Sequence, residues 1–146
     1  MTRAIREALA DGEGECLRLL YNYGLWSRGG GCKGLSRGEC GETAVIDDES
    51  ALEIDSVVEK LRQSRPKVYW VFSLSYVLGL KDYEIAKELR PQLRLRFRTK
   101  PRRRNYFEVT PFDHVLRYVN SSAVNYLIHF AERWIIAELR RRYDEL

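Results

Sequence analysis

Guanidinium groups are concentrated in one short stretch of the chain. The segment Arg90–Arg104, called the basic block below, holds eight basic residues and no acidic one. Guanidinium groups pair bidentately with phosphate oxygens, and each contact releases counterions from a nucleic acid. The basic block therefore predicts binding to a polyanion. The residues expected to contact phosphate groups of DNA or RNA are Arg94, Arg96, Arg98, Lys100, Arg102, Arg103 and Arg104.

The charge balance of the whole chain supports this interpretation. The 146 residues include 25 Lys and Arg against 21 Asp and Glu, a net charge of +4. Without the basic block the balance becomes 17 against 21, a net charge of −4. A solvated basic surface normally mixes in acidic residues, and this block has none. A cationic loop that only aids solubility remains the alternative, but the concentration of charge favours a nucleic acid partner.

Metal binding and catalysis find little support in the sequence. Cys16, Cys32 and Cys40 are separated by 15 and 7 residues, and the only histidines are His114 and His129. A structural zinc site usually needs two ligands two to four residues apart, so neither a metal nor another cofactor is expected. An odd number of cysteines does not predict a disulfide framework. The sequence also lacks a recognisable nucleophile and base pair, so we expect that the protein is not an enzyme.

The chain contains no signal for a membrane. No run of about 18 apolar residues occurs, and the first 15 residues mix charges without a hydrophobic signal region. We therefore expect a cytoplasmic protein without a membrane partner.

Hydrophobic periodicity divides the chain into five segments of a single domain, 1–146. Residues 2–27 predict an N-terminal helix, or two helices if Gly12 and Gly14 break it. A Gly-rich mobile loop is expected at 28–46 and a helical body at 47–89. An inserted basic arm, 90–119, separates this body from a final helical segment at 120–143.

Two shorter patterns lie on either side of the start of the basic block. Pro66 is expected to begin a helix that runs to Leu78, followed by a turn and a short helix that Asp82 caps. After it, Leu93, Leu95 and Phe97 alternate with arginines, a period of two that predicts a strand. Residues 106–109 are its expected partner, so the arm is predicted to be a β-hairpin.

The helix after the arm carries polar residues on its early turns. Asn120 or Ser121 is expected to cap it, and Asn125 could hydrogen-bond an adenine edge in the DNA major groove. A capped surface helix without a ligand is the alternative. The candidate DNA-binding residues, including one from the turn before the short helix, are Lys81, Ser121, Ser122, Asn125, Tyr126, His129 and Arg133.

Several blocks of the sequence carry a family resemblance. They are Leu20–Arg28 (LYNYGLWSR), Asp47–Leu61 (DDESALEIDSVVEKL), Tyr76–Leu80 (YVLGL) with Ile85–Leu89 (IAKEL), and Ala131–Trp134 (AERW). In this order the chain resembles the lambdoid phage Q antitermination proteins, in the branch whose DNA-binding part is similar to sigma factor region 4. The resemblance extends over residues 17–89 and 118–140.

The resemblance implies both a fold and a function. The fold would be mostly α, a sigma region 4-like helix-turn-helix body, here with the basic β-hairpin arm inserted. The function would be that of a phage or prophage transcription antitermination factor. Such a protein binds a promoter-proximal DNA element, loads onto paused RNA polymerase and promotes readthrough of pauses and terminators.

The arm is a departure from the family pattern. In simpler members the recognition helix follows the supporting helix closely, whereas here 90–119 intervenes. The expected partners are double-stranded DNA near a promoter, RNA polymerase with its sigma factor, and nascent RNA as a further candidate for the arm. Two alternatives remain open: a conventional helix-turn-helix regulator that does not travel with polymerase, and an RNA-binding module in which Tyr106 and Phe107 stack on bases.

Overall fold

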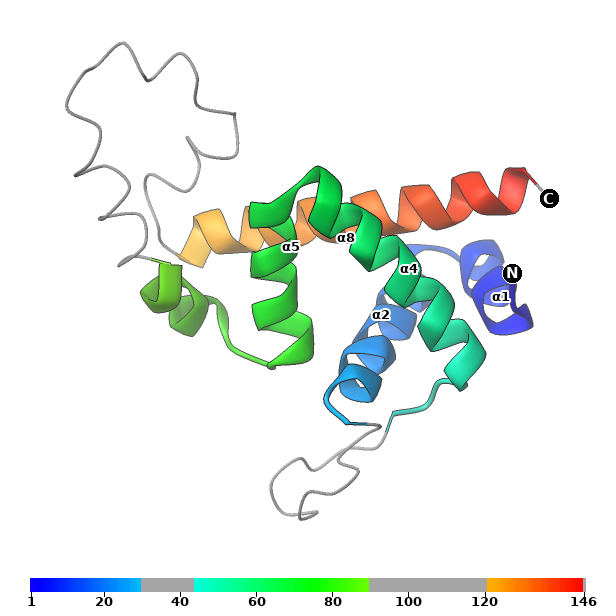
Figure 1. Cartoon of the computed structure of the whole chain (residues 1–146), viewed down its shortest axis with the longest axis horizontal. Helices are drawn as coiled ribbons and strands as arrows, with labels where there is room; N and C mark the ends of the chain where they lie inside the picture. The colour runs from blue at the N-terminus through cyan, green and yellow to red at the C-terminus, as the bar shows by residue number, and fades with distance from the viewer. Residues whose placement is uncertain (30–43, 90–120, 146) are drawn as a thin grey trace, which may run out of the picture.

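The structure, a computed structural model, describes residues 1–29, 44–89 and 121–145. In these ranges 85% of the residues are helical. Figure 1 shows the arrangement of the helices along the chain. Their bounds are α1 (Arg3–Asp11), α2 (Glu13–Ser27), α4 (Asp48–Ser64), α5 (Pro66–Phe72), a π-helix η1 (Ser73–Val77), a short helix at 82–89, and α8 (Ser121–Asp144).

The N-terminal segment forms two helices that meet at Gly12. The Thr2 side chain accepts a hydrogen bond from the backbone N–H of Ile5 and so caps α1. Gly12 has φ 119°, a backbone conformation that L residues rarely adopt. This residue breaks the helix, whereas Gly14 lies inside α2. Of the two possibilities left open by the sequence, the structure therefore has two helices.

Local signals set the ends of α4 and α5. The Asp47 side chain accepts a hydrogen bond from the backbone N–H of Ser50 at 3.0 Å, and Asp48 and Glu49 occupy the first turn. Carboxylates there interact favourably with the helix dipole. The chain turns at Arg65, and Pro66 takes the first position of α5, where its missing N–H has no cost.

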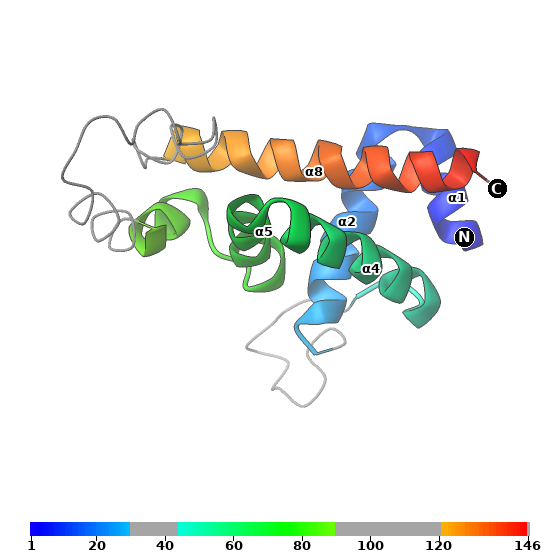
Figure 2. The ribbon, with the colours of Figure 1, turned by 45° about the horizontal axis from the view of Figure 1, so that its top comes forward.

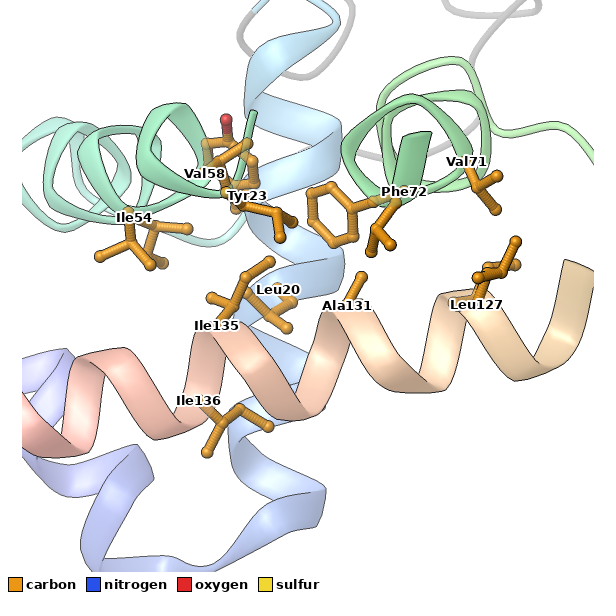
Figure 3. Close-up of a cluster of buried hydrophobic side chains, with 14 of the residues drawn as sticks. Leu20, Tyr23, Ile54, Val58, Val71, Phe72, Leu127, Ala131, Ile135 and Ile136 are labelled. Carbon is orange, nitrogen blue, oxygen red and sulfur yellow. The ribbon is translucent and has the colours of Figure 1, made fainter. Parts of the chain in front are cut away.

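The long helix α8 closes the core over α4 and α5, as Figure 2 shows. Leu20 of α2, Phe72 of α5 and Ile135 of α8 each have no exposed surface. Figure 3 shows these side chains converging between the helices. The core includes further fully buried residues from α4, the 82–89 helix and α8, among them Ala51, Ile54, Val57, Leu61, Ile85, Val124, Leu127 and Ala131.

The helix expected from Pro66 to Leu78 changes character at Ser73. From there the backbone is a π-helix, in which the N–H of Leu78 donates to the carbonyl of Ser73 at 3.1 Å. This wider segment lies against α2, where a Cβ atom at Gly24 would overlap the carbonyl oxygen of Tyr76. Only a residue without a side chain allows this close approach between α2 and η1.

The expected fold class needs correction. The described residues are helical and contain no strand or sheet, so a fold with an inserted β-hairpin is not what the structure supports. The residues assigned to the hairpin lie in 90–120, outside the described ranges. An isolated two-stranded hairpin is marginally stable in water, and the described helices bury their apolar faces against one another without offering a sheet to join. The alternation of Leu93, Leu95 and Phe97 was too short a pattern to predict a strand.

Within the described ranges, none of the helices has the length and apolar character needed to cross a bilayer.

Candidate nucleic-acid interface

The polar residues predicted on the final helix share one exposed face of α8. Ser121, Ser122, Asn125 and Tyr126 are exposed on its first two turns. His129 and Arg133 continue the same face, because helical residues three and four apart lie above one another. The opposite face is held in the core by Val124, Leu127, Ile128 and Ala131. The structure therefore brings six of the predicted DNA-binding residues together on a helix whose orientation is set by the core.

The 82–89 helix lies beside the start of α8. Its Ile85 and Ala86 are buried in the common core, and the small Ala86 side chain permits close packing. Asn125 Nδ2 donates a hydrogen bond to Asp82 Oδ2 at 3.4 Å, which links the two helices at the surface. Lys81, the seventh predicted residue, is exposed in the turn, and its backbone N–H donates to Glu84 Oε1 at 3.1 Å. The contact between these two helices is consistent with the helix-turn-helix arrangement expected from the sequence.

The predicted phosphate contacts cannot be placed in the same way. Arg94, Arg96, Arg98, Lys100, Arg102, Arg103 and Arg104 all lie outside the described residues. The interface is therefore built from the α8 face and the turn before the 82–89 helix.

A groove lies beside the α8 face, with a volume of about 460 Å³. It is bounded by the end of α2, by η1, by the turn after η1 and by α8. Asn125 and His129 contribute to its wall. The remaining lining residues were not predicted as site residues; they are Tyr21, Arg28, Ser75, Tyr76, Gly79, Asp82, Ile128 and Glu132.

Glu132 is a buried carboxylate in the wall of this groove, with 7% of its surface exposed. The Tyr76 hydroxyl donates a hydrogen bond to its Oε2, and His129 Nδ1 lies 3.0 Å from its Oε1. Both oxygens thus have partners, which a buried carboxylate requires. Burial and the adjacent Glu132 carboxylate raise the pKa of the Tyr76 hydroxyl far above its ordinary value, so Tyr76 remains a donor. His129 is therefore anchored by Glu132 while its side chain stays 58% exposed.

Arg28 is held in the groove without a carboxylate partner among the described residues. Its Nη2 donates to the Tyr76 carbonyl oxygen at 3.3 Å, and its Nε is buried with no hydrogen-bond partner. The guanidinium lies against the backbone of Gly79, only 3.0 Å from where a Cβ atom there would be. Gly79 also has φ 72°, which favours glycine. The arginine is thus positioned by backbone groups, and no acidic side chain in the described ranges pairs with it.

The sequence contained only weak signals for this groove. Gly79 could be predicted as the end of a helix, and Arg28 directly precedes three glycines. The burial of Glu132 depends on Tyr76, which is 56 residues away in the chain. No local pattern predicts such a contact.

The described residues do not form a metal site. Among the described side chains, no group of three or more His, Cys, Asp and Glu residues is close enough to hold a metal ion. Cys16 is buried, and its thiol donates to the Ala8 carbonyl oxygen at 3.3 Å. Burial raises the pKa of this thiol, as expected for a core cysteine. Cys32 and Cys40 lie outside the described residues.

Comparisons with known proteins found no relative of this chain. No family model, no curated protein and no solved structure matches the chain. The resemblance to the Q antitermination proteins therefore remains a prediction that depends on the sequence blocks quoted above.

Proposed function

We propose that the protein is a Q-like transcription antitermination factor. It binds a promoter-proximal DNA element through the exposed face of α8, loads onto paused RNA polymerase and promotes readthrough of pauses and terminators. The observation that carries the DNA-binding part is the shared face of Ser122, Asn125, His129 and Arg133 on a helix that the core holds in place. The polymerase part depends on the resemblance of the sequence blocks.

The dimensions of α8 suit a DNA major groove. An α-helix fits the groove, and hydroxyl, amide and guanidinium side chains on its first turns can reach base edges. The 82–89 helix supports α8 from the side through Asp82 and Asn125. In this arrangement Lys81 lies in the turn, where a cation can contact the phosphate backbone.

The electrostatic attraction is assigned to the basic block. Outside it the chain has a net charge of −4, so the rest of the protein does not attract a polyanion over distance. Eight cations within Arg90–Arg104 supply that attraction. If about six of them contact phosphate, the logarithm of the binding constant falls with the logarithm of salt concentration at a slope of about −5.

The experiment starts by finding the DNA element. Duplexes with a random central sequence are enriched for binding to the purified protein, and the selected element is placed beside a promoter with a proximal pause and a downstream terminator. Run-off transcription with purified bacterial RNA polymerase and its sigma factor then measures terminator readthrough. We expect readthrough to rise when the protein is added.

One control assigns the effect to the bound element. The same template with a scrambled element should give no increase, because loading requires the bound DNA. Unchanged readthrough on a template that the protein demonstrably occupies would contradict antitermination. That result would favour the conventional helix-turn-helix regulator instead.

A further inference from the structure

The groove beside α8 is lined by one guanidinium and two carboxylates. Arg28 has hydrogen-bond donors free of any acid among the described residues. Asp82 and Glu132 line the same groove. Two carboxylates against one guanidinium disfavour a phosphate group, since the ligand's charge would be repelled at short range. The groove is instead suited to a neutral, flat ligand with both acceptors and donors.

The position of Arg28 restricts which ligand acceptors it can bind. Its guanidinium lies against Gly79 and donates from Nη2 to the Tyr76 carbonyl oxygen, and its Nε is buried. The N–H groups left for a ligand in the groove are therefore those on Nη1 and Nη2. A guanidinium held in this way recognises two acceptors side by side. The O6 and N7 atoms of guanine form such a pair, whereas adenine offers one acceptor and one donor on that edge.

Asp82 provides a complementary acceptor. Its Oδ2 accepts the hydrogen bond from Asn125, which holds the carboxylate in place at the edge of the groove. Guanine carries its N1–H and its N2 amino group together, and a carboxylate can accept from both. By contrast, both oxygens of Glu132 are already occupied by Tyr76 and His129, so Glu132 shapes the wall.

Space and aromatic surface are also present. The volume of about 460 Å³ falls within the range of pockets that hold small ligands, roughly 300–1,000 Å³. Tyr21 lines the groove and is 44% exposed, whereas the ring of Tyr76 is stacked on Phe72. Aromatic rings provide stacking surfaces for bases that have left a duplex.

We propose that the groove binds one unpaired guanine base of a DNA strand, with Arg28 on its O6 and N7 edge and Asp82 on its N1–H and N2 amino group. This inference rests on the proposed function, because the base belongs to the DNA that the protein binds. The π-helix η1 gives it further support, because π-helical turns are rare and are found frequently at functional sites.

The test uses single-stranded oligothymidylates of 20 nucleotides that differ only at the central base. Fluorescence anisotropy of the full-length protein measures their dissociation constants. We expect central dG to bind about tenfold more tightly than central dT, dA or dC, the effect of one good bidentate base contact. Replacing dG by 7-deaza-dG removes N7, and replacing it by deoxyinosine removes the N2 amino group. Each replacement should abolish most of the preference without any change to the protein.

A protein variant tests the same contact from the other side. Arg28→Lys keeps the charge but removes the planar fork, so the preference for dG should disappear while dT binding changes by less than about twofold. Arg18→Lys is the matched control, since Arg18 lies exposed on α2, the helix that ends just before Arg28, and pairs with Glu15. It should leave both affinities unchanged. Free GMP should displace the dG oligonucleotide far less effectively than an unlabelled dG oligonucleotide does.

The outcomes separate the two proposals. Equal binding of all four oligonucleotides overturns the guanine site and leaves the DNA-binding function standing. Absence of binding to any oligonucleotide or duplex overturns both. Displacement by GMP at the same concentration as the dG oligonucleotide would assign the groove to a free nucleotide and overturn the strand-bound base. An unaltered dG preference in Arg28→Lys, or with 7-deaza-dG, removes Arg28 from the contact and overturns the proposal.

Discussion

Tyr76 of η1 donates a hydrogen bond to the buried Glu132 carboxylate of α8. This contact joins the π-helix to the helix on which the proposed DNA-binding face lies. His129, one turn before Glu132, belongs to that face and contacts the same carboxylate. The polar surface and the interior of the protein are therefore coupled through one acidic residue.

Tyr76→Phe should destabilise the protein because it leaves one oxygen of buried Glu132 without its donor. Such a loss costs about 1–3 kcal/mol. Urea denaturation followed by circular dichroism measures the free energy of unfolding. Tyr126→Phe is the control, because Tyr126 is 53% exposed on α8, and its variant should stay within about 0.5 kcal/mol of wild type. Equal urea midpoints for the two variants would contradict a stabilising role for the hydrogen bond from Tyr76 to Glu132.

Gly24→Ala tests the close approach of α2 and η1. The new Cβ atom would overlap the carbonyl oxygen of Tyr76, so one helix must move. We expect a loss of about 1–3 kcal/mol, despite alanine's higher helix propensity. Gly14→Ala in the same helix has open space around it and should be neutral or stabilising by about 0.5 kcal/mol. Thermal unfolding of the two variants compares them, and a Gly24→Ala protein as stable as Gly14→Ala would contradict the packing described.

Much of the helical framework could be predicted from local residues. Asp47 and Pro66 mark helix starts because a cap and a fixed φ act within one turn. The apolar stripe on Ser121–Asp144 also follows from helical periodicity alone. The exposed face of that helix was predictable for the same reason, since its polar residues occupy the positions that the stripe leaves free.

The π-helix and the groove could not be predicted in this way. Residues Ser73–Val77 have an ordinary helical pattern, and their conformation is coupled to the contact with Gly24, about 50 residues earlier. The position of Arg28 could not be predicted either, because it depends on Gly79 and on the Tyr76 carbonyl oxygen, which are about 50 residues further along the chain. Contacts between distant segments carry no periodic signal, so no local pattern predicts them. The alternation around Leu95, from which the hairpin was predicted, lies outside the described residues.

Glu138 should make stability depend on acid pH. Hydrogen bonds from Arg141 and then Lys60 lower its pKa from 4.5 to about 2. A carboxyl whose pKa is lower in the folded state stabilises the protein above pH 4.5, and this contribution is lost as pH falls from about 4.5 to about 2. Glu138→Gln should cost about 1 kcal/mol at pH 7, because the side chains of Lys60 and Arg141 are 45% and 49% exposed and water screens the interaction.

Measurements over a range of pH test whether the charge of Glu138 is responsible. The free energy of unfolding, measured with urea at pH 7, 4 and 2.5, should differ less between wild type and Glu138→Gln as the pH falls. Glu7→Gln removes an exposed pair with Arg3 and should change stability by less than about 0.5 kcal/mol throughout. A difference that is constant with pH would exclude the charge of Glu138 as its cause.

Alanine variants of Arg133 and Arg140 test which half of α8 binds DNA. Both are exposed and lie seven residues apart on nearly the same side of the helix. The proposed interface uses the early turns, so Arg133→Ala should weaken binding to the selected duplex about tenfold, and Arg140→Ala by less than twofold. Electrophoretic mobility shifts measure both. Equal losses would move the interface toward the C-terminal end of α8.

The basic block should supply affinity without sequence preference. Replacing Arg102, Arg103 and Arg104 by alanine removes three of its eight cations, so binding to the selected and to random duplexes should weaken by the same factor. The salt dependence should become shallower by about three units of slope, since fewer counterions are released.

The matched control for the basic block removes the same charge from elsewhere. Arg3, Arg6 and Arg18 are exposed on α1 and α2, and their triple alanine variant also lowers the net charge by three. If attraction came from net charge alone, this variant would lose as much affinity as the block variant. We expect an unchanged slope instead, because phosphate contact requires cations at the interface. A loss confined to the selected duplex in the block variant would mean that these arginines read sequence, and that base recognition extends beyond α8.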